Sequence, residues 1–234
     1  MKNRILFLLA IGFAWHPVAA QLSQQETDLL QKLDSLKKSQ SVAKHFAELY
    51  FSTTVRATNY FLNRSQREQD FIRRFETRFA GFFFRSAEAR TQNISIPVEW
   101  KTYFTGDELT PLQYQLIGIN AHINGDIWQA LTTEFSLAEI RENKDSYYSF
   151  QKGLILQYRE FYVASRKSNS KIRTLHVATA GLDKLFGKMM LVRWRKRQLQ
   201  LAVLYFNNRQ KFDKKLEKLH QKMEHIDRMI LQHL

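Results

Sequence analysis

The chain has 234 residues, with 36 Lys and Arg against 22 Asp and Glu, a net charge of +14, and no cysteine. The absence of cysteine excludes disulfides, thiolate metal sites and a thioether-linked lipid anchor, so the fold must rest on its hydrophobic core. Glycine and proline are scarce, at 8 and 3 residues, and aromatic residues make up 13%. This balance predicts an all-α fold, a helical bundle of about six to eight helices.

The first twenty residues have the pattern of a secretory signal peptide. Lys2 and Arg4 form a charged start, residues 5–15 are a short apolar run, and small residues end the segment at Ala20. Cleavage after Ala20 predicts an exported protein, periplasmic or secreted, with residues 21–234 as a single domain. No later stretch approaches the roughly 18 consecutive apolar residues of a transmembrane helix.

In the first half of the mature chain, hydrophobic periodicity predicts helices at residues 26–38, 41–62 and 67–90. The third helix carries a phenylalanine stripe with spacings of three and four, typical of a core-facing surface: Phe71, Phe75, Phe79, Phe82 and Phe83. Arg78 interrupts the flank of this stripe, which predicts either a snorkelling side chain or a pair with an acid. Residues 91–107 have no clear period and are predicted as a loop, with or without a short extended segment.

In the second half, Thr110 and the following proline predict the start of a helix that runs to about residue 134. An aromatic-rich helix is predicted at residues 146–165, and a last one at 210–234 whose apolar spacing is typical of an antiparallel or coiled-coil contact. Polar and glycine residues mark the starts and breaks expected between helices: Ser136 or Asn143, the linker-like residues 167–171, Gly181, Gly187, and Asn207 with Asn208.

The positive charge is concentrated near the C-terminus, where residues 184–234 hold 13 Lys and Arg but 4 Asp and Glu. We interpret residues 188–234 as a basic helical arm. Its cations either form a solvated face or contact an anionic membrane or a partner, at about 1 kcal/mol for each charge near an anionic surface. Residues 193–197 interleave a tryptophan with cations, as nucleic-acid grooves do, but the predicted export argues against nucleic acid.

The segment 113–131 is the part of the sequence with the clearest chemical character. It sets His122 and Asp126 four residues apart, which places them on one face of a helix. Gln115 falls on the same stripe, whereas Asn120 and Asn124 lie on the far flank of the adjoining apolar stripe. A helix with polar shoulders around an apolar centre is expected to be mostly buried, so these groups need partners.

Several chemistries fit this pattern. An imidazole and a carboxylate on one turn can share a divalent metal such as zinc, and His45 is the best candidate for a third ligand. The histidine can instead act as a base or bind a ligand without metal, with Arg78, Gln115 and the two asparagines as orienting groups. Alternatively, His122 bonds to Asp126 or Arg78 in a buried network that only fixes helix packing.

The motif resembles that of an uncharacterised bacterial family, a domain of unknown function with Pro-Leu-Gln, then Gly-Ile-Asn-Ala-His-Ile, then an aspartate. The matching segments are residues 111–113, 118–123 and Asp126, with further resemblance at residues 46–54, residues 78–80 and Trp100, and weaker resemblance past Trp194. This resemblance implies an all-helical domain with His122, Asp126, Asn120 and Arg78 as shared features, and it implies no activity.

The helix is more distantly similar to one in the zinc-dependent phospholipase C and P1 nuclease superfamily. The similarity rests on Gly118, His122, Gly125, Asp126 and Gln129. It implies zinc bound by the histidine and aspartate, and a metal-bound hydroxide that attacks a phosphodiester. Thr132 stands where a further histidine is expected, so the resemblance implies one or two metals at most.

Two functional hypotheses follow. The first is a pocket that binds or hydrolyses an unidentified small molecule or lipid, with His122 as base or ligand and Asp126 as its partner; a metal-dependent hydrolase of phosphodiester or lipid substrates is one version. The alternative is a non-enzymatic envelope protein whose basic C-terminal helices bind an anionic membrane or a partner, while His122 only holds the core together.

Overall fold

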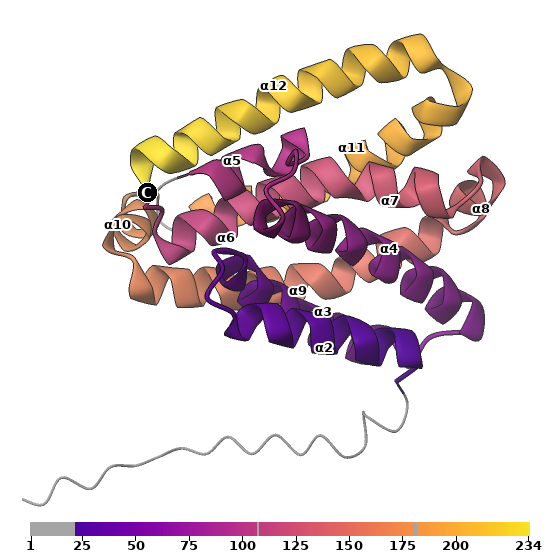
Figure 1. Ribbon diagram of the computed structural model, residues 1–234, viewed down its shortest axis with the longest axis horizontal. Helices are drawn as coiled ribbons and strands as arrows, with labels where there is room; N and C mark the ends of the chain where they lie inside the picture. Colours follow the sequence, from indigo (N-terminus) through magenta and orange to yellow (C-terminus); the bar gives the residue numbers. More distant parts are fainter. Residues whose placement is uncertain (1–21, 107, 180–181) are drawn as a thin grey trace, which may run out of the picture.

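The computed structural model of the protein describes residues 22–106, 108–179 and 182–234, and these residues form helices and no strand (Figure 1). The α-helices are α2 (Gln24–Lys38), α3 (Ala43–Phe61), α4 (Gln66–Thr91), α5 (Lys101–Thr105), α6 (Pro111–Asn120), α7 (Ile127–Glu134), α8 (Leu137–Glu142), α9 (Lys144–Ser168), α10 (Ser170–Ala178), α11 (Leu182–Asn207) and α12 (Arg209–His233). A 3-10 turn, η1 (Val98–Trp100), precedes α5, and a π-helical segment, η2 (Ala121–Asp126), joins α6 to α7. The all-α prediction is confirmed, and the short helices α5, α8 and α10 raise the number above the six to eight predicted.

Local sequence signals explain where these helices begin. Ser23, Ser65, Thr110 and Ser136 each form a capping box, in which the hydroxyl accepts the N–H of the third helical residue and that residue's side chain accepts the cap N–H. Thr110 is thus the N-cap that the sequence predicts. Both proposed later starts are used, since Ser136 precedes α8 and Asn143 precedes α9.

The predicted loop at residues 91–107 is wrong over its second half. Trp100, Tyr103 and Phe104 have helical spacing and are buried, so η1 and α5 form there to pack these rings into the core. The predicted interruption near Gly187 is also wrong, because α11 continues through it. A side chain at this position would collide with the Tyr158 hydroxyl, so this glycine permits a close approach of α9.

The remaining predicted breaks have mixed outcomes. Of the predicted linker residues 167–171, Asn169 is the one that lies outside a helix, and it separates α9 from α10. Asn208 ends the long helix and caps α12, as the sequence predicts. The predicted signal peptide and Gly181 lie outside the described residues.

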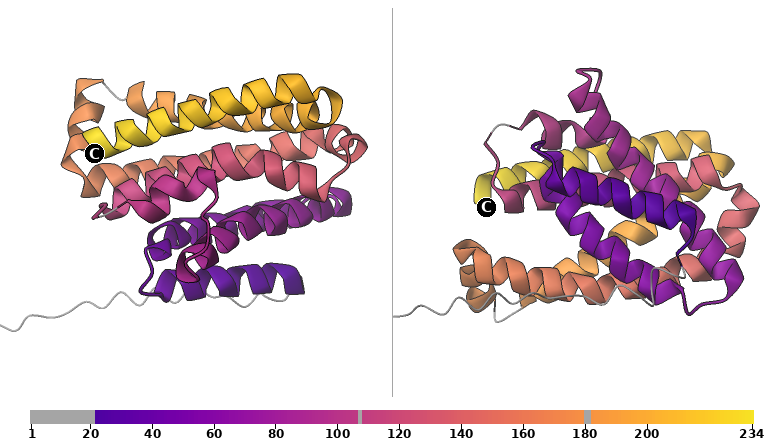
Figure 2. Two further views of the ribbon diagram at one scale, coloured as in Figure 1. Left: turned by 45° about the horizontal axis from the view of Figure 1, so that its top comes forward. Right: turned by 60° about the horizontal axis from the view of Figure 1, so that its bottom comes forward.

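The motif helix α6–η2–α7 runs through the middle of the bundle, from residue 111 to residue 134 as predicted (Figure 2). Its first half contacts α3 and α12, and its second half contacts α4 and α11. Gly118 permits the contact with α3, because a Cβ atom there would lie 2.5 Å from the ring of Phe46. Helices therefore cover this element on opposite sides, which is why its polar side chains are buried.

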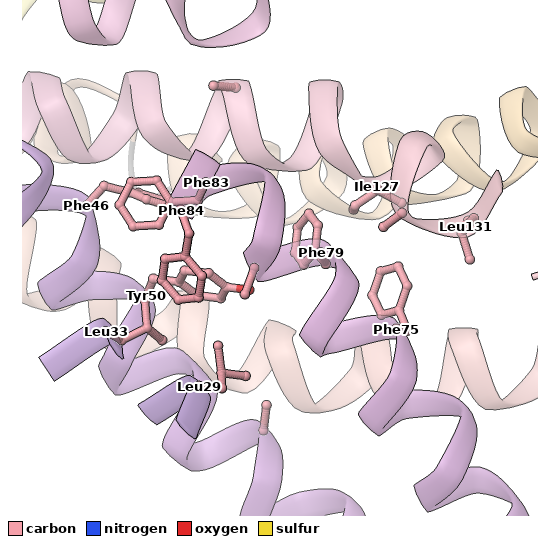
Figure 3. Close-up of a cluster of buried hydrophobic side chains, with 14 of the residues drawn as sticks. Leu29, Leu33, Phe46, Tyr50, Phe75, Phe79, Phe83, Phe84, Ile127 and Leu131 are labelled. Atoms are coloured by element: carbon pink, nitrogen blue, oxygen red, sulfur yellow. The ribbon is translucent and has the colours of Figure 1, made fainter. Parts of the chain in front are cut away.

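The phenylalanine stripe of α4 forms much of the core, as the sequence predicts. Phe71, Phe75, Phe79 and Phe83 are buried and Phe82 is half-buried. Figure 3 shows Phe75 and Phe79 between α4 and the motif helix, which carries Ile127 and Leu131. Core packing is thus the role of the stripe, and one of its rings also borders the site.

The basic C-terminal arm folds back onto the bundle. Helix α12 packs on α11 and α6, and it buries Phe212, Leu219 and Met223. Lys211, Lys214, Lys215, Lys218 and Lys222 stay exposed on its outer side. None of the described helices has the length and hydropathy of a membrane span. An anionic membrane or partner for these lysines remains a prediction.

Candidate functional site

The motif helix changes its winding where its polar residues lie. Residues Ala121–Asp126 form a π-helical segment that contains both His122 and Asp126. Short π segments within α-helices are uncommon and occur often at functional sites. The wider turn is a feature that the regular spacing of the sequence does not predict.

His122 and Asp126 form a buried hydrogen-bonded pair. The Nδ1 atom of His122 lies 2.7 Å from Oδ2 of Asp126. The indole Nε1 of Trp100 donates to the same carboxyl group, at 3.0 Å from Oδ2 and 3.2 Å from Oδ1. His122 is 3% exposed and Asp126 is 1% exposed. Asp126 thus orients the imidazole, and Trp100 orients Asp126.

Aromatic rings fix the plane of the imidazole. The ring of Phe79 stacks on His122 with a centroid distance of 3.5 Å, and Tyr50 meets it edge-on at 4.6 Å. Phe46 lies against another side at 5.4 Å. The remaining ring nitrogen, Nε2, is buried and has no hydrogen-bond partner among the described residues.

Burial sets the protonation of the pair. It lowers the pKa of His122 well below its usual range, with the charge of Arg195 acting in the same direction. Burial and the charge of Glu99 raise the pKa of Asp126, against the effect of the Trp100 hydrogen bond. The imidazole is therefore neutral at pH 7. A neutral imidazole carries one N–H group. When it is on Nδ1, which then donates to the Asp126 carboxylate, Nε2 accepts a hydrogen bond; when it is on Nε2, that nitrogen donates and Nδ1 accepts from a protonated Asp126.

A cavity of about 460 Å³ adjoins the pair. Its walls come from α3, α4, α6, η2, α9 and α11, and apolar side chains such as Leu49, Ile119 and Leu154 make up much of the lining. His122 and Gln115 also line it. Small-molecule sites are commonly of this kind, with volumes of roughly 300–1,000 Å³, apolar walls and a few polar groups.

Three further polar residues of the cavity lining are buried like His122, and sequence reasoning missed them as site residues. They are Tyr50, Glu76 and Arg195, from α3, α4 and α11. The Tyr50 hydroxyl is buried without a partner among the described residues. Burial raises the pKa of Glu76 to about 7, and the charge of Arg195 opposes this shift.

Arg195 belongs to the basic cluster at residues 193–197, but its side chain is buried and the residue is 2% exposed. A signal for this burial was present in α11, where Arg195 continues the spacing of Leu191, Leu199 and Ala202 at four, four and three residues. An arginine on the apolar stripe of a helix points inward and requires a partner there.

Comparison with known proteins gives a family. A model described as a family of unknown function, DUF5995, matches residues 18–233. The chain belongs to this family. Comparison with curated proteins and with solved structures finds no significant match. The bacterial-family resemblance thus has a counterpart in DUF5995, whereas the similarity to the phospholipase C and P1 nuclease superfamily has no support.

The structure separates the polar residues of the DUF5995 chain into two sets. Gln115 lies in the cavity with His122, but Asn120 and Asn124 face α12 instead. Asn120 donates to the carbonyl of Met223 at 3.0 Å and to Oδ1 of Asp227 at 2.8 Å, and Asn124 donates to Oδ1 of Asn120 at 2.9 Å. The asparagines therefore attach the C-terminal helix to the bundle.

Arg78 and His45 also lie apart from the pair. Arg78 is half exposed and donates to Glu134 at 3.0 Å, so the alternative of a pair with an acid is the one observed. It lies at the surface because its neighbour Phe79 faces the core. The ring of His45 stacks on Tyr114 with a centroid distance of 5.0 Å.

The donor set does not fit the predicted metal site. Among the described residues, no group of three His, Asp or Glu side chains lies close enough to hold an ion, so His45 does not join His122 and Asp126 as a ligand set. Asp126 bonds to Nδ1 of the imidazole and to Trp100. A carboxylate in this position orients the histidine and does not share a metal with it. An imidazole held in this way can exchange a proton with a bound molecule at Nε2.

Proposed function

We propose that the protein binds a small amphipathic molecule in the cavity beside His122. The observation that carries this proposal is the buried Nε2 atom, which Asp126 and the surrounding rings hold in place without a partner among the described residues. Buried polar atoms in proteins are almost always hydrogen-bonded, and an unsatisfied one costs about 1–3 kcal/mol. A ligand that bonds to Nε2 and covers the apolar walls recovers this energy.

The proposal is tested by titrating the purified protein with decanol, decanoate and decylamine in a calorimeter. We expect at least one of the three to bind with a stoichiometry of one. In the variant Ile119→Trp, the added ring fills cavity space, and the affinity is expected to fall at least about tenfold, equivalent to about 1.4 kcal/mol. Ile119 lines the cavity one turn before His122 and Ile123.

The matched control is Leu112→Trp, which adds a ring at a half-buried position on the same helix but outside the cavity. Its affinity is expected to equal that of the unchanged protein. Failure of all three compounds to bind, or equal weakening by the two tryptophan variants, would contradict a binding site in this cavity.

We also propose that the protein acts outside the cytoplasm, on the strength of the charged start, apolar run and small-residue end at Ala20. Mass spectrometry of the N-terminal peptide of protein made in its native cells should find a chain that begins at Gln21. A retained Met1 would refute cleavage at this position.

A further inference from the structure

Arg195 is a buried cation, and one edge of its guanidinium group has no hydrogen-bond partner among the described residues. Its side chain lines the cavity, and its guanidinium group lies over the ring of Tyr147 at 4.9 Å. The Nε and Nη2 atoms are buried and have no hydrogen-bond partner among the described residues. These two nitrogens lie on one edge of the guanidinium plane, and their parallel N–H groups match the two oxygens of a single carboxylate or phosphate.

No carboxylate among the described residues forms an ion pair with Arg195. Glu76 is near enough to feel its charge, but burial keeps the pKa of Glu76 at about 7, so much of this carboxyl group is uncharged at neutral pH. A buried charge without a partner is costly, and proteins rarely keep one. Since no described residue supplies the counterion, this edge of the guanidinium group favours a bound anion.

We propose that the ligand of the cavity carries a carboxylate head, whose two oxygens bind the Nε and Nη2 edge of Arg195, and an apolar chain that lies along the cavity walls. This inference rests on the proposed function, since it names the class of molecule that the cavity takes. Tyr50 and His122 are the neighbouring polar groups, with their rings 4.6 Å apart, and both line the same cavity.

The charges in the cavity favour a monoanion. Arg56 also lines the cavity, but it is paired with Glu160, and both of these side chains are exposed at its rim. Among the described residues that line the cavity, Arg195 is then the cation left for the buried end of the ligand, and Glu76 becomes a competing negative charge as the pH rises. A phosphate monoester carries about −1.5 to −2 at pH 7 and would leave charge unbalanced. A carboxylate, with one charge, matches Arg195.

The inference is tested by calorimetric titration at pH 6 with decanoate, decanol and decyl phosphate. We expect decanoate to bind about 10- to 100-fold more tightly than decanol, since hydrogen bonds between charged groups are the strong ones. Arg195→Met should abolish this preference, and Arg195→Lys, which keeps the charge but loses the paired edge, should reduce it. Arg193→Met changes an exposed arginine on the same helix and should leave the preference intact.

Each outcome decides a different point. Equal affinity for decanol and decanoate would overturn the carboxylate head while leaving a binding cavity in place. Tighter binding of decyl phosphate than of decanoate would replace the carboxylate by a phosphate. A preference unchanged in Arg195→Met would remove Arg195 from the site. If Arg195→Met does not fold, Arg195→Lys carries the same test. Binding of none of the compounds would overturn this inference and the proposed function together.

Discussion

Replacing Asp126 by alanine is expected to lower the free energy of unfolding by about 2–5 kcal/mol, because two buried polar groups lose their partner and each unsatisfied group costs about 1–3 kcal/mol. The change leaves two buried groups, Trp100 Nε1 and His122 Nδ1, without their hydrogen-bond partner. Each abandoned polar group keeps its desolvation cost in the folded state and loses the bond that offset it. Urea denaturation at pH 7 measures the loss.

Two controls make this result specific. Asp126→Asn keeps an oxygen to accept from Trp100 and supplies an N–H group for Nδ1, so its loss should be clearly smaller than that of alanine. Asp213→Ala removes an exposed aspartate that pairs with Arg209, and surface changes of this kind usually stay within about 0.5 kcal/mol. Equal losses for the alanine and asparagine variants at position 126 would show that its hydrogen bonds do not stabilise the fold.

Replacing Glu76 by glutamine is expected to stabilise the protein at pH 8 and to change little at pH 4. Burial raises the pKa of Glu76 from its ordinary value of 4.5 to about 7. Below pH 4.5 the group is uncharged in both the folded and the unfolded chain. Between pH 4.5 and 7 the unfolded chain releases the proton while the folded chain keeps it, so the contribution of Glu76 to stability falls as the pH rises.

Above pH 7 the contribution of Glu76 to the free energy of unfolding has fallen to its lowest value. At about 1.36 kcal/mol for each pKa unit, the total fall amounts to roughly 3 kcal/mol. Glutamine cannot ionise, so the difference in unfolding free energy between variant and unchanged protein should grow by about this amount from pH 4 to pH 8. Glu88→Gln, at an exposed position on the same helix, provides the control and should show no such growth. A Glu76→Gln difference that is equal at both pH values would mean that the carboxyl group is solvated in the folded protein.

The sequence predicted the fold well because its local signals agree with the final packing. The phenylalanine spacing of α4 defines a buried face, and the Thr110 capping box starts the motif helix at the predicted residue. The second half of the predicted loop failed because a helical period over Trp100, Tyr103 and Phe104 is too short to separate from chance. Burial of these three rings decides the local structure there.

The sequence predicts only those contacts of the site that join residues close together in the chain. The spacing of His122 and Asp126 brought the two side chains together, as their hydrogen bond confirms. Which nitrogen Asp126 contacts depends on the π-helical segment and on Trp100, which the motif does not contain. Arg195 lies in the cavity but belongs to α11, far from the motif in sequence, and Asn120 hydrogen-bonds to α12 and not to the cavity. Both placements depend on tertiary packing that no short sequence pattern encodes.

The most direct test of the cavity as a ligand site is the 15N NMR spectrum of the histidine rings during titration with decanoate and with decanol. Our account predicts that the Nε2 signal of His122 shifts and saturates at one equivalent of the tighter binder. The signal of His225, which is exposed on α12, should stay in place. A His122 signal that remains unchanged while the calorimeter records binding would place the ligand elsewhere and contradict the account.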